Sequence, residues 1–511
     1  MDTPSEAPGD GAGVEGLHLQ GRSAQETLGG VPEPGRPIEK VPTGIAGLDE
    51  VLLGGLPVGR TTLVGGGPGT GKTVLALEFL HRGALAGAPG VFVSFEERVN
   101  DLRANAGAMG MELSPLEAAG KLRLVHAAVP HDAVYAGQFD IQGLLAMLEG
   151  HTAAVGAGRL VIDAIDVLMR VFGDPDRERQ ELHILHQWLR DRGLTALLTA
   201  KAGGEGMRTY PFLDFMADCV LLLDQRIERQ VRTRRLNVVK YRGSGFLSNE
   251  YPYVLSERGI VVMPISSASL RQAVVAERVS SGDAAFDALL GGGFQRGSCI
   301  LLAGPSGAGK TTLAGIFVQA ACRRGEGVLY VSFEEAATTL TGNLRSVGID
   351  VQTPADAGML QIVTALPEAM GVEQHLLRVY DAIESSDPRH IVIDAISACR
   401  RMGSEQAAFD FCARLVTTCK QRGITCLYTN QTSDPRDVVE LTGLGLSSLV
   451  DTLIALPFHD DGQRLRRRMV VIKSRGSAHS TGYQDFAITD NGPVFGAGAV
   501  AGALQGEGGG R

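Results

Sequence analysis

No run of about 20 apolar residues occurs in this chain of 511 residues, so the sequence has no candidate transmembrane helix. Its first residues lack a basic segment followed by an apolar one, which argues against a secretory signal and for a cytoplasmic protein. Lysine and arginine number 48 against 57 acidic residues, giving a formal net charge of −9. This balance argues against a nucleic-acid binder held mainly by phosphate contacts. We therefore expect no membrane partner and no nucleic-acid partner.

Paired metal-binding cysteines are also missing. The chain has seven cysteines, and none of them forms a Cys-x-x-Cys pair. Cys412, Cys419 and Cys426 are evenly spaced in apolar sequence, but no histidine ligands lie beside them. Buried thiols in a reducing compartment are therefore a better interpretation than zinc ligands or disulfides.

What the sequence does contain is the phosphate-loop pattern G-x-x-x-x-G-K-[ST], twice, at 66–73 and 304–311. Each match follows an apolar run and precedes a helical one, as this loop requires. Its glycines let backbone N–H groups surround phosphate oxygens at the start of a helix. The lysine would reach the β- and γ-phosphates, and the last hydroxyl would ligate magnesium. The predicted nucleotide-binding residues are Gly66, Gly69, Thr70, Gly71, Lys72, Thr73 and Val74, and Gly304, Gly307, Ala308, Gly309, Lys310, Thr311 and Thr312.

The chain repeats itself beyond these loops. The two loop lysines are 238 positions apart, and the segments 93–97 and 331–335, both Val-Ser-Phe-Glu-Glu, keep the same offset. Further motif pairs follow in the same order, which indicates a tandem duplication. Each copy alternates short apolar runs with helical stretches, which predicts an α/β fold with a mainly parallel sheet flanked by helices. We predict a disordered leader at 1–40, domains at 41–264 and 279–495, a linker at 265–278, and a flexible tail at 496–511.

Two aspartates end aliphatic runs at matching places in the copies. Asp163 follows Leu-Val-Ile, and Asp394 follows Ile-Val-Ile. A carboxylate at such a strand end can organise magnesium, directly or through water, as a Walker B aspartate does. The alternative is an aspartate that caps a helix, but coupling to an upstream phosphate loop in both copies favours the metal site.

The acidic pairs Glu96-Glu97 and Glu334-Glu335 follow the next predicted strand. A carboxylate there can polarise the attacking water or hydroxyl, with one glutamate as the base and its neighbour tuning it or the metal. The alternative is a solvated acidic pair at a helix start. Recurrence in register after the same Ser-Phe dipeptide favours catalysis, and two adjacent desolvated carboxylates should raise a pKa.

Basic side chains alternate near the end of each copy, within the segments 240–244 and 473–477. In a strand, alternate residues lie on one face, so both cations of a pair would project together from an edge hairpin. An arginine placed in this way can stabilise transferring phosphate in a neighbouring subunit. The alternative is a solvated basic face. The predicted contacts to a neighbour's nucleotide are Lys240, Arg242, Ser244, Lys473, Arg475 and Ser477.

With these motifs placed, the chain from about 41 to 494 resembles the KaiC family, the double-domain ATPases and autokinases of the circadian clock, within the RecA-like phosphate-loop proteins. The resemblance implies a hexamer of two stacked rings with ATP and Mg²⁺ at the subunit interfaces. It implies slow ATP hydrolysis in the first domain, with Glu96 as base. It implies autophosphorylation of serine or threonine in the second, with Glu334 as base.

The resemblance also implies phosphate acceptors. The family carries adjacent hydroxyl residues before an Asp-Thr that starts a strand, and Ser447 and Ser448 precede Asp451-Thr452 here. Thr442 matches a further hydroxyl of the same segment. The corresponding stretch of the first copy, 214–218, has no hydroxyl pair, so the acceptor belongs to the second domain alone. The alternative is a serine pair that makes local backbone hydrogen bonds.

The partners expected for this chain differ in part from those of the family. The chain ends in Gly- and Ala-rich sequence soon after Phe486-Ala487-Ile488, which argues against KaiA-type regulation. A KaiB-like partner of the first ring fits the resemblance, although no single residue identifies it. Two alternative functions are a RecA-like DNA-dependent ATPase, disfavoured by the acidic balance, and an ATP-gated scaffold ring with negligible chemistry.

Overall fold

The computed structural model describes residues 38–127, 141–172, 174–201, 213, 216–228, 231–264, 277–432, 445–462 and 464–496. Most of the predicted leader, linker and tail therefore lies outside the described residues, although Lys40, the last residue of the predicted leader, belongs to strand β1 (Lys40–Val41). Within the described ranges, no helix is long and apolar enough to cross a membrane.

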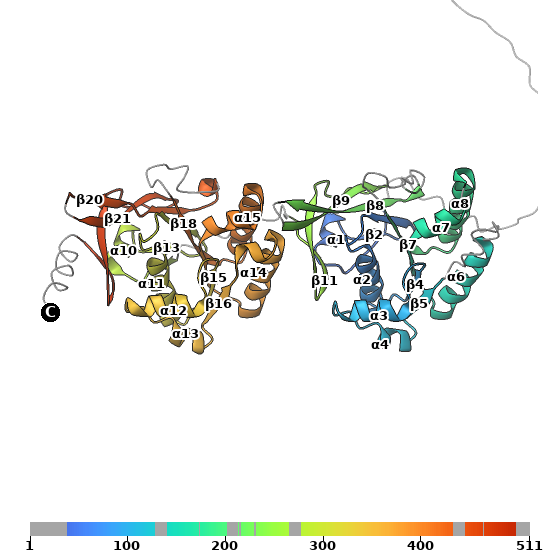
Figure 1. Cartoon of the computed structure of the whole chain (residues 1–511), viewed down its shortest axis with the longest axis horizontal. Helices are drawn as coiled ribbons and strands as arrows, with labels where there is room; N and C mark the ends of the chain where they lie inside the picture. Colours follow the sequence, from blue (N-terminus) through green and yellow to red (C-terminus); the bar gives the residue numbers. More distant parts are fainter. Residues whose placement is uncertain are drawn as a thin grey trace, which may run out of the picture. The chain divides into compact units, whose positions relative to one another are not determined.

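The first domain is built on a sheet of nine strands in the order β11-β10-β9-β8-β3-β7-β6-β4-β5 (Figure 1). Strands β5, β4, β6, β7, β3 and β8 run parallel, whereas β9, β10 and β11 pair antiparallel. Its elements are β1 (Lys40–Val41), α1 (Leu48–Val51), β2 (Leu56–Pro57), β3 (Thr61–Gly66), α2 (Lys72–Leu85), β4 (Gly90–Ser94), α3 (Val99–Gly107), α4 (Ser114–Ala118), β5 (Leu122–His126), α6 (Ile141–Val155), β6 (Arg159–Asp163), α7 (Ile165–Phe172), α8 (Pro175–Asp191), β7 (Thr195–Lys201), β8 (Cys219–Glu228), β9 (Val231–Tyr241), β10 (Tyr251–Ser256) and β11 (Gly259–Val262).

The second domain repeats this order as β16-β15-β17-β18-β14-β19-β21-β22-β23, with β20 paired to β21. Its parallel and antiparallel parts match those of the first sheet. Its elements are β12 (Arg278–Val279), α10 (Ala284–Leu289), β13 (Phe294–Gln295), β14 (Cys299–Gly304), α11 (Lys310–Arg323), β15 (Val328–Ser332), α12 (Ala337–Ser346), α13 (Gln352–Asp356), β16 (Leu360–Thr364), η2 (Pro367–Ala369), α14 (Val372–Ser386), β17 (His390–Asp394), η3 (Ile396–Met402), α15 (Glu405–Gln421), β18 (Thr425–Gln431), η4 (Leu446–Ser448), β19 (Thr452–Ala455), β20 (Phe458–Asp460), β21 (Leu465–Ser474), β22 (Gln484–Thr489) and β23 (Gly492–Phe495).

Each sheet is covered on both faces, because its central strands are apolar along their whole length. Alternate residues of these strands enter two separate cores. In the first domain, Phe92 and Val161 face the core that includes α2 and α3, while Val91 and Leu160 face the core that includes α6 and α8. The second domain divides in the same way between α11 and α12 on one face and α14 and α15 on the other. The expected fold, two tandem RecA-like domains with mainly parallel sheets, is confirmed.

The cysteines lie where apolar sequence predicts. Six of the seven are buried, and Cys322 is half-buried. Burial raises the pKa of Cys219 to about 12 and that of Cys322 to about 11, so both stay as thiols.

Candidate active sites

The two phosphate loops connect β3 to α2 and β14 to α11. Each helix begins directly after a glycine in the left-handed region, Gly71 at φ +91° and Gly309 at φ +96°, which only glycine adopts without strain. Neither helix start receives a side-chain cap, so its first N–H groups face the loop. This geometry is an anion site, since free amides and the helix dipole both favour negative charge.

The loop lysines lie across their own loops. Lys72 Nζ donates to the carbonyl oxygens of Gly66 and Gly67 at 2.8 and 2.9 Å. Lys310 Nζ donates to Gly304 and Pro305, both at 2.8 Å. Burial lowers the pKa of both lysines, and the nearby Walker B aspartates oppose that shift. A phosphate entering the loop would offer each ammonium a charged acceptor in place of neutral carbonyls.

The Walker B aspartates end β6 and β17, and each is buried and bonded by hydroxyl groups. Thr73 Oγ1 donates to Asp163 Oδ2 at 2.8 Å, and Thr199 donates to Oδ1. Thr311 Oγ1 donates to Asp394 Oδ2 at 2.9 Å, and Thr429 donates to Oδ1. Burial raises the pKa of Asp163, while the two threonine hydrogen bonds oppose the rise.

The donor set in each domain fits magnesium bound together with nucleotide. A hydroxyl on the first turn of the helix lies within hydrogen-bond distance of a carboxylate, and both are the hard oxygen ligands that Mg²⁺ prefers. The hydroxyl and the carboxylate would leave the remaining coordination positions to phosphate oxygens and water. Across the described ranges, no group of three or more His, Cys, Asp or Glu side chains could hold a metal ion.

The acidic pairs follow β4 and β15 as the sequence predicts, but their surroundings differ. Glu96 is paired with Lys201 Nζ at 2.8 Å, with 47% of its side chain exposed. The residue of β18 that corresponds to Lys201 is Gln431, which brings no charge. Partial desolvation and the nearby charge of Asp394 raise the pKa of Glu334. A raised pKa makes Glu334 a stronger proton acceptor than an ordinary glutamate.

The second glutamates occupy matching positions. The N–H groups of Glu97 and Glu335 donate to Ser94 Oγ and Ser332 Oγ at 2.9 and 3.0 Å. Their carboxylates accept from Asn105 and Asn343, each at 3.2 Å. Partial desolvation also raises the pKa of Glu97. An upward pKa shift was expected within each pair, and it is found for Glu97 in the first domain and for Glu334 in the second.

The predicted cations lie at the ends of β9 and β21. Lys240 and Lys473 are in the strands, and Arg242 and Arg475 follow just beyond them. In strand order β9 and β21 lie inside their sheets, but their pairing with β10, β20 and β22 does not reach the cations, so Lys240 is paired only with β8 and Lys473 only with β19. The antiparallel extension that covers these hairpins was not anticipated.

In the second domain these cations contact the predicted acceptor segment of the same chain. Arg475 donates to the carbonyl oxygen of Ser448 at 2.9 Å, and Lys473 Nζ donates to that of Val450 at 2.8 Å. Ser448 itself is exposed on η4, which begins one residue before Ser447. Thr442 and the side chain of Ser447 lie outside the described residues.

The predicted serines of the cation segments have local partners. Ser244 Oγ donates to the carbonyl oxygen of Gly245 at 2.9 Å. Ser477 Oγ accepts from Arg278 at 2.7 Å and lies 3.2 Å from the carbonyl oxygen of Leu290. A contact from either hydroxyl to a neighbour's nucleotide would require these bonds to rearrange.

Several residues around the two sites escaped the sequence reasoning. Thr199 donates to Oδ1 of Asp163, and Thr429 donates to Oδ1 of Asp394. The two threonines lie at matching places in β7 and β18. Each domain also has a tyrosine that contacts its site. In the first, Tyr253 donates to the carbonyl oxygen of Thr70 at 2.6 Å, and in the second, Tyr330 donates to Asp394 Oδ2 at 2.7 Å. Burial raises the pKa of Tyr330 well above its usual value, so its hydroxyl is a donor. Comparison of the copies position by position could have found all four.

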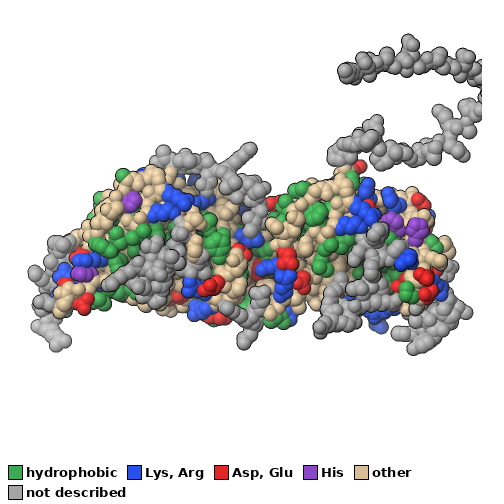
Figure 2. All heavy atoms as spheres, turned by 90° about the horizontal axis from the view of Figure 1, so that it is seen from above, with side chains coloured by type: hydrophobic (Ala, Val, Ile, Leu, Met, Phe, Trp, Pro, Cys, Tyr) green, Lys and Arg blue, Asp and Glu red, His purple; other side chains and the backbone are tan. Residues whose placement is uncertain are grey.

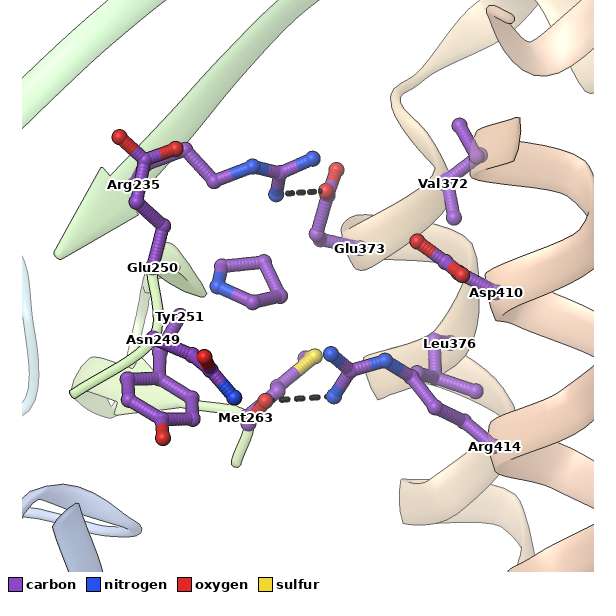
Figure 3. Close-up of a pocket in the computed structure, with 12 residues that line it drawn as sticks. Arg235, Asn249, Glu250, Tyr251, Met263, Val372, Glu373, Leu376, Asp410 and Arg414 are labelled. Carbon is purple, nitrogen blue, oxygen red and sulfur yellow. Dashed lines mark hydrogen bonds and ion pairs between the residues drawn. The ribbon is translucent and has the colours of Figure 1, made fainter. Parts of the chain in front are cut away.

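A separate pocket of about 310 Å³ contains none of the predicted site residues (Figure 3). Its lining comes from β9, β10 and the residue after β11 on one side and from α14 and α15 on the other. Arg235 is paired with Glu373 across it, and Arg414 donates to the carbonyl oxygen of Met263. Arg235 and Glu373 thus neutralise one another across the pocket, and the guanidinium of Arg414 is bonded to a backbone carbonyl oxygen.

The surface drawn in Figure 2 mixes charges of both signs. Among the described residues drawn on this face, basic side chains lie in separate clusters between acidic and neutral ones.

The comparisons with known proteins agree with this geometry. A family model described as "ATPase: KaiC" matches residues 41–267 and again 279–497. The circadian clock protein KaiC2 of Synechocystis sp. is 38% identical over 458 residues, covering 89% of this chain and 80% of the relative. The circadian clock oscillator protein KaiC of Parasynechococcus marenigrum is 34% identical over 460 residues, covering 89% and 90%.

The match therefore spans both domains, both phosphate loops, both Walker B aspartates and both acidic pairs. A further relative, KaiC of Synechococcus elongatus, is 34% identical over 460 residues and covers 89% of each chain. The chain belongs to the KaiC family of ATPases.

Proposed function

We propose that the chain hydrolyses ATP slowly in its first domain and phosphorylates its own serine and threonine residues in its second, in clock-type or signalling regulation. The proposal includes Mg²⁺ at both sites and a hexameric assembly with nucleotide between subunits. The relatives named as circadian clock proteins support the regulatory setting.

In the first domain, Lys72 and the loop amides would hold the phosphates, while Thr73 and Asp163 would hold Mg²⁺. The metal would draw negative charge from the phosphate oxygens. Glu96 would orient and deprotonate water from just beyond the carboxyl end of β4, at the same edge of the sheet as the loop. Its carboxylate is held by an ion pair with Lys201, which would have to loosen for Glu96 to accept a proton, and this supports a slow hydrolysis.

In the second domain, Glu334 would accept the proton of an acceptor serine. The serine oxygen forms a bond to the γ-phosphorus, the bond from that phosphorus to the ADP oxygen breaks, and ADP leaves. Lys310 would stabilise the charge on the transferred group, with Arg475 and Lys473 supplied by the neighbouring subunit. ATP is the only co-reactant, and the proton from serine goes to Glu334.

One observation carries the kinase proposal: the predicted trans cations of the second domain bond to the acceptor segment itself. The bonds from Arg475 to Ser448 and from Lys473 to Val450 join them within one chain. A subunit that presents these cations to its neighbour's nucleotide would therefore deliver Ser448 with them. Among the described residues of the first domain, no hydroxyl pair occupies the corresponding place before β8.

The decisive experiment incubates the purified full-length chain with Mg-ATP and maps phosphate by mass spectrometry. We expect phosphate on Ser447, Ser448 or Thr442, its loss in Glu334→Gln, and its persistence in Glu96→Gln. Glu96→Gln should instead reduce phosphate release. Absence of phosphate at all three positions under every condition would overturn the kinase assignment.

Two other functions make different predictions. A RecA-like DNA motor should show ATP turnover that rises with single-stranded DNA and falls steeply with salt. An ATP-gated scaffold should keep its turnover unchanged in Glu96→Gln and Glu334→Gln while still assembling.

Mass photometry with and without ATP tests the hexamer, and a pull-down with a KaiB-like protein tests that partner.

A further inference from the structure

The Walker B aspartate of the second domain receives one hydroxyl more than that of the first. Tyr330 lies on β15 and is 1% exposed, and its hydroxyl reaches Asp394 Oδ2 at 2.7 Å. Thr311 already donates to the same oxygen at 2.9 Å, and Thr429 holds the other oxygen. Three hydroxyls of the described residues thus converge on one buried carboxylate.

The first domain has phenylalanine at the matching place. Phe92 lies on β4 beside β6 just as Tyr330 lies on β15 beside β17, and it is 0% exposed. Asp163 therefore accepts from Thr73 and Thr199 alone among the described residues. The two sites differ at this point by a single phenolic oxygen in otherwise matching surroundings.

The Tyr330 hydroxyl occupies one acceptor position of Asp394, which is then closed to any other donor, including a metal-bound water. A carboxylate has about four lone-pair positions, and three of those on Asp394 already accept hydroxyl hydrogens. The two threonines alone fix both oxygens, so Tyr330 is not needed to orient the group. A further hydrogen bond to a charged acceptor disperses its negative charge and so weakens its attraction for a cation.

We propose that Tyr330 is a positioning residue that acts through Asp394 to weaken the hold of the second domain on Mg²⁺ relative to the first. The inference rests on the proposed function, because it needs Mg-nucleotide in both domains. Nucleotide retention in the second domain then responds to Mg²⁺ in a range where the first domain is already saturated.

The test measures nucleotide release rather than catalysis. The full chain carries Lys72→Ala, so that its first site does not bind nucleotide. It is loaded with a fluorescent ATP analogue and then chased with unlabelled ATP at a series of Mg²⁺ concentrations. The readout is the Mg²⁺ concentration at which release is half-maximally slowed. Tyr330→Phe should lower this concentration by about 3- to 10-fold, since it frees one charge-assisted acceptor.

The matched control is Tyr428→Phe. Tyr428 is equally buried on β18, and within the described part of the chain Asp394 receives no hydrogen bond from it. This variant should leave the Mg²⁺ midpoint unchanged. The reciprocal variant Phe92→Tyr, read in a Lys310→Ala chain, should raise the midpoint of the first site.

The possible failures are distinguishable. If the analogue is not retained at any Mg²⁺ concentration by the unsubstituted chain, the proposed function fails. If it is retained but Tyr330→Phe leaves the midpoint unchanged or raises it, only the role of Tyr330 is overturned. A thermal melt of each variant shows whether it is folded, and because Tyr330→Phe removes one atom it should melt within a few degrees of its parent.

Discussion

The two domains fold in the same strand order but surround their nucleotide residues differently. In the first, a lysine faces the candidate base, a tyrosine braces the phosphate loop, and phenylalanine lies beside the Walker B aspartate. In the second, these places hold a neutral amide, a phenylalanine and a tyrosine. The pairs are Lys201 and Gln431, Tyr253 and Phe486, and Phe92 and Tyr330.

These exchanges distinguish the two nucleotide sites, which are alike in their shared motifs. The phosphate loop of the first domain has a further side-chain hydrogen bond, since Thr70 donates its hydroxyl to the carbonyl oxygen of Gly67 at 2.8 Å, whereas Ala308 has no hydroxyl to donate. The candidate base of the first domain is paired with Lys201, whereas Gln431 brings no charge to the matching place in the second. Asp394 also accepts one hydroxyl hydrogen more than Asp163. The two nucleotide sites thus differ by a few side chains on one fold.

The largest expected effect comes from removing either loop lysine. Lys72→Ala should weaken ATP binding at the first site on the order of 100-fold, and Lys310→Ala should do the same at the second, because each ammonium neutralises phosphate charge. Equilibrium dialysis should find about one nucleotide per chain in each variant instead of two. Two nucleotides retained in either variant would mean that the loops do not bind as predicted.

The sequence was sufficient for the architecture, and the nucleotide-binding chemistry of each loop stays a prediction. Repetition at a constant offset predicts the duplication, and continuous apolar strands predict sheets covered on both faces. Asp163 and Asp394 lie against the loop threonines as their strand-end positions predict. These features depend on local pattern, which a single sequence displays directly.

The differences between the domains were not predicted, because they depend on contacts between distant strands. The sequence around Tyr330 does not indicate that its hydroxyl will donate a hydrogen bond to Asp394, which lies 64 residues later. Lys201 meets Glu96 only because β7 and β4 lie near one another across β6. The position of β9 and β21 inside the sheet likewise follows from later strands that pair with them.

A second prediction exchanges the charge beside the candidate bases. Gln431→Lys should place a cation near Glu334 and reduce autophosphorylation by about tenfold, because a paired carboxylate is a weaker base. The matched variant Lys201→Gln should remove the ion pair of Glu96 and increase phosphate release by the first domain. Phosphate incorporation and phosphate release are measured on the same samples. Equal effects of either variant on both reactions would contradict separate bases.

The same comparison predicts a pH dependence. The pKa of Glu334 is raised by partial desolvation and by Asp394, so this carboxylate gains a proton at a higher pH than an ordinary glutamate. A base works only when deprotonated, so autophosphorylation should fall as the pH drops through that raised pKa. Gln431→Lys should move the midpoint to lower pH, since a nearby cation favours the carboxylate. A profile that is unchanged in this variant would argue against Glu334 as the base.

The smallest expected effect concerns the brace on the first loop. Tyr253→Phe removes the hydrogen bond to the carbonyl oxygen of Thr70 and should speed nucleotide release from the first site by about threefold, with a loss of about 1 kcal/mol in stability. Tyr241→Phe is the matched control, because its hydroxyl donates at 2.9 Å to the carbonyl oxygen of Gly55, outside the loop. It should cost similar stability without changing release. Equal release in both variants would assign the tyrosine of β10 to folding alone, whereas faster release only in Tyr253→Phe would show that this hydroxyl helps the first domain to hold its nucleotide.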